Sequence, residues 1–365
     1  MKKSLYLLML LWLAGLIVWL AVVRTGLTTE TAITKNIWWT GLLLFGAAIT
    51  GFLFQPMLKT HFPSLKDSRV AVDPRFLLKD HEILMGYYPV VALVLFLGGL
   101  AISRPLYGAN ILFEIKSWHF WWATVATGIL NVFIFYFLTK GFRYGDLSLV
   151  SVTQAMSPLF VLPISLAVFA WLGGKIPMAN PAVSPAGFFG ILITIAALAL
   201  NISIGKKIPV TTSSPEGDWF ASRPVISGLL GTFIGSVAVN FDKVAIDSAN
   251  PFLMGIFMAL IVSVITAVWT YAKGGWGRII FIAKKYVRSF LLVGLVYGLV
   301  VLIMNVTLYG ANVNYYATVK RTSAIFGIFY GIYVLKEGVN KKDRLVRVAV
   351  GVLVIFGILL ITLKG

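Results

Sequence analysis

The sequence has no cysteine and little charge: only 12% of its 365 residues are Asp, Glu, Lys or Arg. The absence of cysteine excludes disulfide bridges, thiol catalysis and thiolate metal sites. Hydrophobic residues make up 59% of the chain and the mean hydropathy is +0.90, so the chain cannot solvate itself as a water-soluble globule. The composition therefore predicts an all-α polytopic membrane protein, and we expect it in the cell membrane.

Acidic residues are scarce relative to basic ones, 13 against 31, which gives a formal net charge of +18. The cations stand in short clusters between apolar runs, where membrane insertion alone places them, so no nucleic-acid partner is expected. Histidine is also rare, and His61, His81 and His119 belong to no metal-binding pattern. With no paired acidic motif and no phosphate-binding loop either, we predict no enzyme activity, catalytic residue, metal or cofactor.

Eleven segments are long and apolar enough to cross about 30 Å of hydrocarbon as helices. They are 4–23, 38–57, 85–103, 118–139, 147–171, 184–203, 224–241, 251–272, 289–310, 315–335 and 345–363. The first follows two lysines, as a signal peptide does, but its apolar run is too long and lacks a small-residue cleavage site. We interpret it as a retained helix.

The positions of Lys and Arg predict an orientation in the membrane. Alternate connections, counted from the N-terminus, carry 22 of these residues, whereas the remaining connections carry 7. Because cytoplasmic loops are enriched in Lys and Arg, the N-terminus is expected in the cytoplasm and the C-terminus outside. The basic connection 274–288 is expected to form either an amphipathic helix on the lipid headgroups or a solvated loop.

Two segments near the ends of the predicted halves resemble each other. When 152–160 is aligned with 318–326, Ser157 matches Ser323 and Gln154 matches Lys320, and a glycine-bearing final helix follows each segment. This order predicts two five-helix halves, 38–203 and 224–365, joined by a polar linker at 204–223 and preceded by an extra N-terminal helix and loop at 1–37. Because five is odd, the halves form an inverted repeat with a ten-helix core.

Three motifs resemble those of the drug/metabolite transporter superfamily, specifically the EamA-like transporters. They are the corner Leu335-Lys-Glu337-Gly, the helix end Asn240-Phe-Asp242-Lys243, and Val319-Lys-Arg-Thr-Ser323 in the penultimate helix. The corner of the first half, Trp171-Leu-Gly-Gly-Lys-Ile-Pro177, lacks the glutamate. The resemblance implies a secondary transporter that moves a small metabolite by alternating access between the two repeats.

Lys320 and Arg321 stand side by side inside a predicted membrane span. Each cation at mid-membrane costs about 2.5–3.5 kcal/mol, so the pair predicts an anion or a watery cavity beside it. We expect the pair to bind an anionic group of the substrate, or an internal carboxylate that the substrate displaces; alternatively, Lys320 extends its side chain to the membrane surface. Further candidate substrate ligands are polar residues in or near apolar spans: Gln154, Asn240, Asn305, Asn312, Asn314 and Tyr316.

Asp242 and Lys243 are the candidate coupling or gating residues. Asp242 is expected to pair with Lys320 or Arg321 in one access state and to accept a proton in another, which would couple transport to a proton gradient. The alternative is an ion-paired helix end formed by Asp242, Lys243 and Asp247. A different functional class also remains open, a lipid-binding or lipid-translocating membrane protein whose cationic pair holds a lipid phosphate.

Overall fold

The computed structural model describes residues 32–62, 78–107, 111–172, 223–310, 313–337 and 341–364, together with isolated positions between 185 and 200. The described residues form helices and connecting turns and contain no strand. Six of the described helical segments are long and apolar enough to cross a membrane: 41–61, 80–104, 119–144, 147–172, 224–248 and 251–309; a shorter apolar helix covers 323–334. The predicted helix at 4–23 and most of the one at 184–203 lie outside the described residues.

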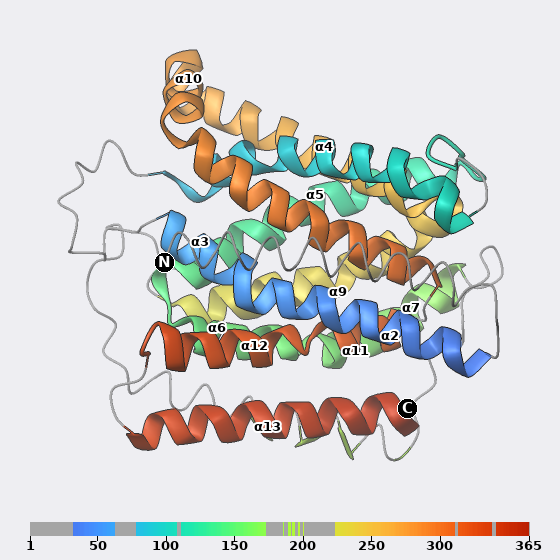
Figure 1. Ribbon diagram of the computed structural model, residues 1–365, viewed down its shortest axis with the longest axis vertical. Coiled ribbons are helices and arrows are strands. Elements are labelled where there is room, and N and C mark those ends of the chain that lie inside the picture. The colour runs from blue at the N-terminus through green and yellow to red at the C-terminus, as the bar shows by residue number, and fades with distance from the viewer. Residues whose placement is uncertain are drawn as a thin grey trace.

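The helices run roughly side by side across the molecule (Figure 1). In chain order they are α2 (Ala32–Ile49), η1 (Thr50–Phe54), α3 (Gln55–His61), α4 (Asp80–Tyr107), α5 (His119–Tyr144), α6 (Leu147–Ala155), α7 (Ser157–Leu172), α9 (Pro224–Ser248), α10 (Pro251–Gly310), α11 (Val313–Lys320), α12 (Ser323–Phe329), η3 (Tyr330–Val334) and α13 (Lys341–Lys364). The largest contacts join α4 to α10 and α5 to α9, while α13 packs against α11, α12 and α6.

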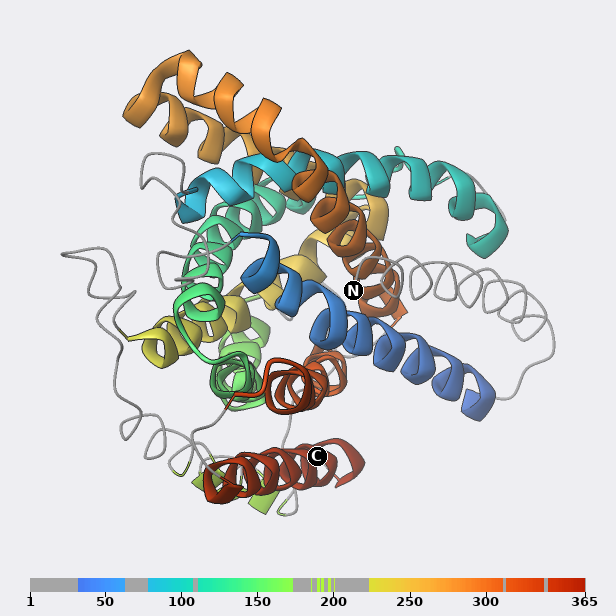
Figure 2. The same cartoon turned by 60° about the vertical axis from the view of Figure 1, so that its left-hand side comes forward.

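Helix α10 includes two predicted spans, 251–272 and 289–310, and the basic connection predicted between them. It consists of two helices that meet at a kink at Gly275, whose φ of 64° is a conformation that favours glycine, and the second helix continues to Gly310. The bend projects beyond the rest of the bundle in two views (Figures 1 and 2). Residues 276–288 are therefore helical rather than a solvated loop, and Arg278 forms an ion pair with Glu82 at 2.7 Å.

Two predicted spans, 147–171 and 315–335, are each broken in the middle. The first breaks at Met156, between α6 and α7, where Pro158 cannot donate the next helical hydrogen bond. The second breaks between α11 and α12, where Thr322 donates its side-chain hydroxyl to the carbonyl of Val319.

The two breaks have matching backbone hydrogen bonds, in which the donor follows the acceptor by the same number of residues. Met156 N donates to Thr153 O at 3.2 Å, and Thr322 N donates to Val319 O at 3.1 Å. The bond from Leu159 N to Met156 O likewise matches the bond from Ile325 N to Thr322 O, both at 3.0 Å. The alignment that matched Ser157 with Ser323 also matches the residues in these four bonds: Thr153 with Val319, Met156 with Thr322, and Leu159 with Ile325.

The broken helices cross in a reciprocal way. Helix α6 packs against α12 and α7 packs against α11, so the first part of each broken helix faces the second part of the other. The opening helices are exchanged too: α2 and η1 contact α11 and α12, while α9 contacts α6 and α7. The breaks therefore lie together in the interior of the bundle.

Candidate functional site

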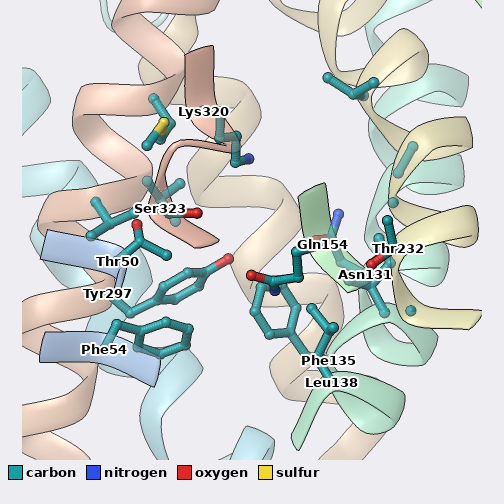
Figure 3. A pocket seen from close by; sticks show the side chains of 18 of the residues that line it. Thr50, Phe54, Asn131, Phe135, Leu138, Gln154, Thr232, Tyr297, Lys320 and Ser323 are labelled. Atoms are coloured by element: carbon teal, nitrogen blue, oxygen red, sulfur yellow. The ribbon is translucent and has the colours of Figure 1, made fainter. Parts of the chain in front are cut away.

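A cavity of about 110 Å³ lies in the interior next to the break between α11 and α12 (Figure 3). Its lining comes from η1, α3, α5 and α6 of the predicted first half and from α9, α10, α11 and α12 of the predicted second half. The lining mixes polar side chains, among them Lys320, Arg321, Asp242, Gln154 and Asn305, with a larger number of apolar ones. Both predicted halves thus contribute to one site.

Lys320 and Arg321 both line this cavity. Lys320 ends α11, and its Nζ donates to the hydroxyl of Tyr316 at 3.2 Å; Arg321 follows in the break, and its Nη2 donates to Ser157 Oγ at 2.8 Å. The Nε of Arg321 is buried without a hydrogen-bond partner among the described residues. No carboxylate of the described part of the chain lies within 4.0 Å of either cation.

Gln154 lines the cavity from α6, at the position aligned with Lys320. Its Oε1 accepts a hydrogen bond from Gln55 Nε2 at 2.5 Å, and Ser151 Oγ donates to Gln55 Oε1 at 3.1 Å. In Figure 3 the polar tips of Gln154, Tyr297 and Lys320 are directed toward the same space. A polar chain of α3 and α6 side chains therefore leads away from the cavity toward the start of α6.

Asp242 also lines the cavity, but its partner differs from the one expected. Its Oδ1 accepts a hydrogen bond from the hydroxyl of Thr127 on α5, and Asn131 Nδ2 donates to the carbonyl of Thr127 at 2.8 Å. Asp242 therefore shares the cavity with Lys320 and Arg321 without an ion pair to either one. The expected pairing is absent from this conformation.

The other predicted ligands separate into two groups. Asn305 and Tyr316 line the cavity, with Asn305 Nδ2 also donating to the carbonyl of Pro251 at 3.1 Å. Asn240 does not line it: its Nδ2 donates to Ser236 O at 3.0 Å and its Oδ1 accepts from Ser165 at 2.8 Å. Asn314 lies on α11, its side chain outside what is described, and Asn312 lies outside the described residues.

Lys243 lies at the end of α9, away from the cavity. Its Nζ donates to the carbonyls of Leu308 and Tyr309, both at 3.1 Å, and pairs with Asp247 at 2.9 Å. The alternative of an ion-paired helix end therefore applies to Lys243 and Asp247 and not to Asp242. The predicted role of Lys243 in coupling has no contact in this structure that supports it.

An aromatic wall opposite the cations was missed in the sequence. The rings of Phe54 and Tyr297 stack with centroids 4.3 Å apart, and Phe135 meets Tyr297 edge-on at 5.0 Å. All three line the cavity, and they come from η1, α5 and α10. No sequence signal distinguishes them, because 14% of the chain is aromatic and each lies in an ordinary apolar span.

A second group of polar residues joins the predicted halves at one end of the bundle. The carboxylate of Glu337 accepts hydrogen bonds from Lys59 Nζ at 2.7 Å, from Leu147 N at 2.8 Å, and from the backbone N and the Oγ of Ser148, both at 2.9 Å. The buried Arg347 donates to Ser148 Oγ at 2.5 Å and to Asp146 Oδ2 at 2.8 Å. We call Lys59, Asp146, Ser148, Glu337 and Arg347 the end network.

Comparison with known proteins gives little to add to this geometry. No family model matches the chain, and no curated protein matches it. One solved structure, described only as "Crystal structure of protein", is similar over 89% of this chain and 96% of its own, with 12% identity and a TM-score of 0.49. Function is therefore argued from the site.

Proposed function

We propose that this protein is a secondary transporter that moves a small anionic metabolite across the membrane by alternating access. The proposal includes membership of the drug/metabolite transporter superfamily, as an EamA-like transporter with two inverted five-helix repeats. In such transporters the substrate site lies near the middle of the membrane where the repeats meet. The small-molecule substrate and the surrounding lipid are the expected partners.

The arrangement of the broken helices supports the repeat. The breaks at Met156 and Thr322 have matching hydrogen bonds in one alignment, and α6, α7, α11 and α12 cross reciprocally. Discontinuous helices at the centre of a membrane protein are tolerated where they line a cavity, and transporters use them to bind substrate. The cavity beside Arg321 has this setting.

The single observation that carries the proposal is the set of groups that surround the two cations, Lys320 and Arg321. Lys320 and Arg321 line an interior cavity with hydroxyl groups as their hydrogen-bond partners and without a carboxylate within 4.0 Å among the described residues. Two cations with one carboxylate, Asp242, in the same cavity leave an excess positive charge, which is costly inside a membrane protein, and an anion that enters the cavity would offset that cost. The planar guanidinium of Arg321 also suits bidentate binding of a carboxylate or phosphate.

Reconstitution into liposomes tests this function directly. We expect uptake or exchange of at least one labelled small anion from a panel that includes benzoate, acetate and inorganic phosphate. Lys320→Gln and Arg321→Gln should each lower the rate about tenfold or more, because a charge-assisted hydrogen bond contributes about 1.5–3 kcal/mol. The exposed Lys116, which donates to the Tyr309 hydroxyl outside the cavity, provides the control Lys116→Gln, and its rate should be unchanged.

Transport that is equally fast in all four proteins would refute the anion site. Absence of any transport, together with a phospholipid that copurifies with wild type but not with Arg321→Gln, would favour the lipid-binding alternative instead. The cavity size argues against that alternative: about 110 Å³ is less than the roughly 150 Å³ of a cavity that accepts one benzene molecule.

A further inference from the structure

Resting on the proposed transport function, the cavity also indicates which anions fit. Its two cations are neighbours in the chain, and most of the other lining side chains are aromatic or aliphatic, including Phe54, Phe135, Leu138, Tyr297, Val300 and Met304. Figure 3 shows the amine of Lys320 on one side of the space and the rings of Phe54, Phe135 and Tyr297 on the other. A ligand that satisfies both ends needs a charged group and an apolar body.

The apolar end is buried, which makes its contact with a ligand favourable. Phe54, Phe135 and Tyr297 are 3%, 8% and 8% exposed, so they are shielded from lipid and solvent. A small, fully hydrated anion would leave this surface without an apolar partner, whereas an apolar group removes its own surface from water against it. The wall therefore favours an organic anion over an inorganic one.

The charges of the cavity restrict the anionic group. Lys320 and Arg321 share the cavity with the single carboxylate of Asp242, so ionised side chains leave one net positive charge. A carboxylate carries one negative charge, which balances this, whereas a phosphate monoester carries about 1.5–2 at neutral pH. The guanidinium of Arg321 donates to Ser157 through Nη2, and its N–H groups beyond that bond remain as donors for the oxygens of a carboxylate.

The size of the cavity restricts the apolar body. A volume of about 110 Å³ is below the roughly 150 Å³ of an apolar cavity that binds benzene, so the apolar body of a ligand is at most one ring or a short branched chain. We infer that the substrates are small hydrophobic monocarboxylates no larger than benzoate, with the carboxylate on Lys320 and Arg321 and the apolar body against Phe54, Phe135 and Tyr297.

Binding to the full-length protein in detergent, measured by isothermal titration calorimetry, tests the inference. Benzoate should bind at least about tenfold more tightly than acetate, because the ring adds apolar burial, and more tightly than inorganic phosphate or benzyl alcohol. Arg321→Gln should weaken benzoate at least about tenfold and leave benzyl alcohol unchanged. Phe135→Asn should reduce benzoate to the level of acetate while acetate itself is unaffected.

Two further variants serve as controls for Phe135→Asn. Phe135→Leu keeps an apolar wall, so benzoate affinity should stay within about threefold of wild type. Phe233, whose ring packs against Phe160 and does not line the cavity, provides the matched control Phe233→Leu, which should have no effect on benzoate.

The failures of the inference and of the proposed function are distinguishable. Tighter binding of phosphate than benzoate, still sensitive to Arg321→Gln, would overturn the hydrophobic monocarboxylate and leave anion transport standing. Benzoate binding that is insensitive to both Arg321→Gln and Phe135→Asn would place it elsewhere and overturn the inference. If no anion binds and none is transported, both fall.

Discussion

At the scale of single residues, Glu337 has more partners than either cation in the cavity. Its buried carboxylate accepts four hydrogen bonds, three of them from the first residues of α6 and one from Lys59. Carboxylates are favoured at a helix N-terminus, where backbone N–H groups are unsatisfied and the helix dipole is positive. Glu337 follows η3 in the chain, so its carboxylate links this part of the chain to the start of α6, although the two are far apart in the sequence.

Replacement of Glu337 by Gln should lower the free energy of unfolding by about 2–4 kcal/mol. Glutamine has the same size, but its amide is neutral, leaves the Lys59 ammonium without its charge partner and directs an NH₂ toward N–H donors. Titration of the purified protein with SDS measures the change. Glu114→Gln is the matched control because Glu114 is exposed, and its effect should stay within about 0.5 kcal/mol. Equal effects of the two substitutions would contradict the importance of the end network.

At the scale of helices, close packing of backbones brings the broken elements together. A Cβ atom at Gly51 would lie 2.9 Å from Gly327 N and even closer to the carbonyl of Ser323, so η1 and α12 are in direct backbone contact. At Gly41, one helix earlier in the same span, a Cβ atom would meet no atom of the described residues within 4 Å.

The two glycines should respond to alanine with opposite signs. Gly51→Ala is expected to destabilise the protein by about 1–3 kcal/mol, because η1 and α12 must separate. Gly41→Ala should stabilise it by about 0.5–1 kcal/mol, because alanine has less conformational freedom to lose in a helix. SDS titration of both variants decides the matter, and a stabilised Gly51→Ala protein would mean that the two helices do not meet as described.

The helices themselves could be predicted because apolar length is a strong signal, whereas their interruptions could not all be predicted. Pro158 marks the break at Met156 in the sequence, but nothing comparable marks the break at Arg321 and Thr322. A helix over the basic connection 274–288 was one of two alternatives, and the sequence did not decide between them because the basic residues also resemble a solvated connection between spans. In the site, Lys320 and Arg321 were found from their charge alone. The hydrogen bond from Thr127 to Asp242 could not be predicted, because Thr127 approaches from α5, a contact that only the tertiary structure contains.

At the scale of the whole molecule, the end network and the cavity lie along one path between the predicted halves. Gln154 lines the cavity and binds Gln55, Gln55 binds Ser151, and Ser148 of the same helix α6 binds Glu337. In a transporter with alternating access, one end must be closed while the other admits substrate. The end network is suited to hold this end closed, because each of its hydrogen bonds to Glu337 joins residues of the two predicted halves.

The lack of native cysteine allows this closure to be measured with single introduced thiols. Thr232 lines the cavity, and its hydroxyl donates to the carbonyl of Gly228 in its own helix, so Thr232→Cys should perturb the fold little. We expect a water-soluble maleimide to modify Cys at this position several-fold faster when Glu337→Gln is also present, because weakening the end network lets water and reagent enter from that side.

Thr266→Cys is the control: Thr266 is equally buried and bonds the Val262 carbonyl in its own helix, but does not line the cavity. Its modification should be slow in both backgrounds. A Thr232→Cys rate that Glu337→Gln leaves unchanged, in protein that still binds substrate, would mean that other contacts close this end, whereas equal acceleration at both positions would indicate general loosening of the fold.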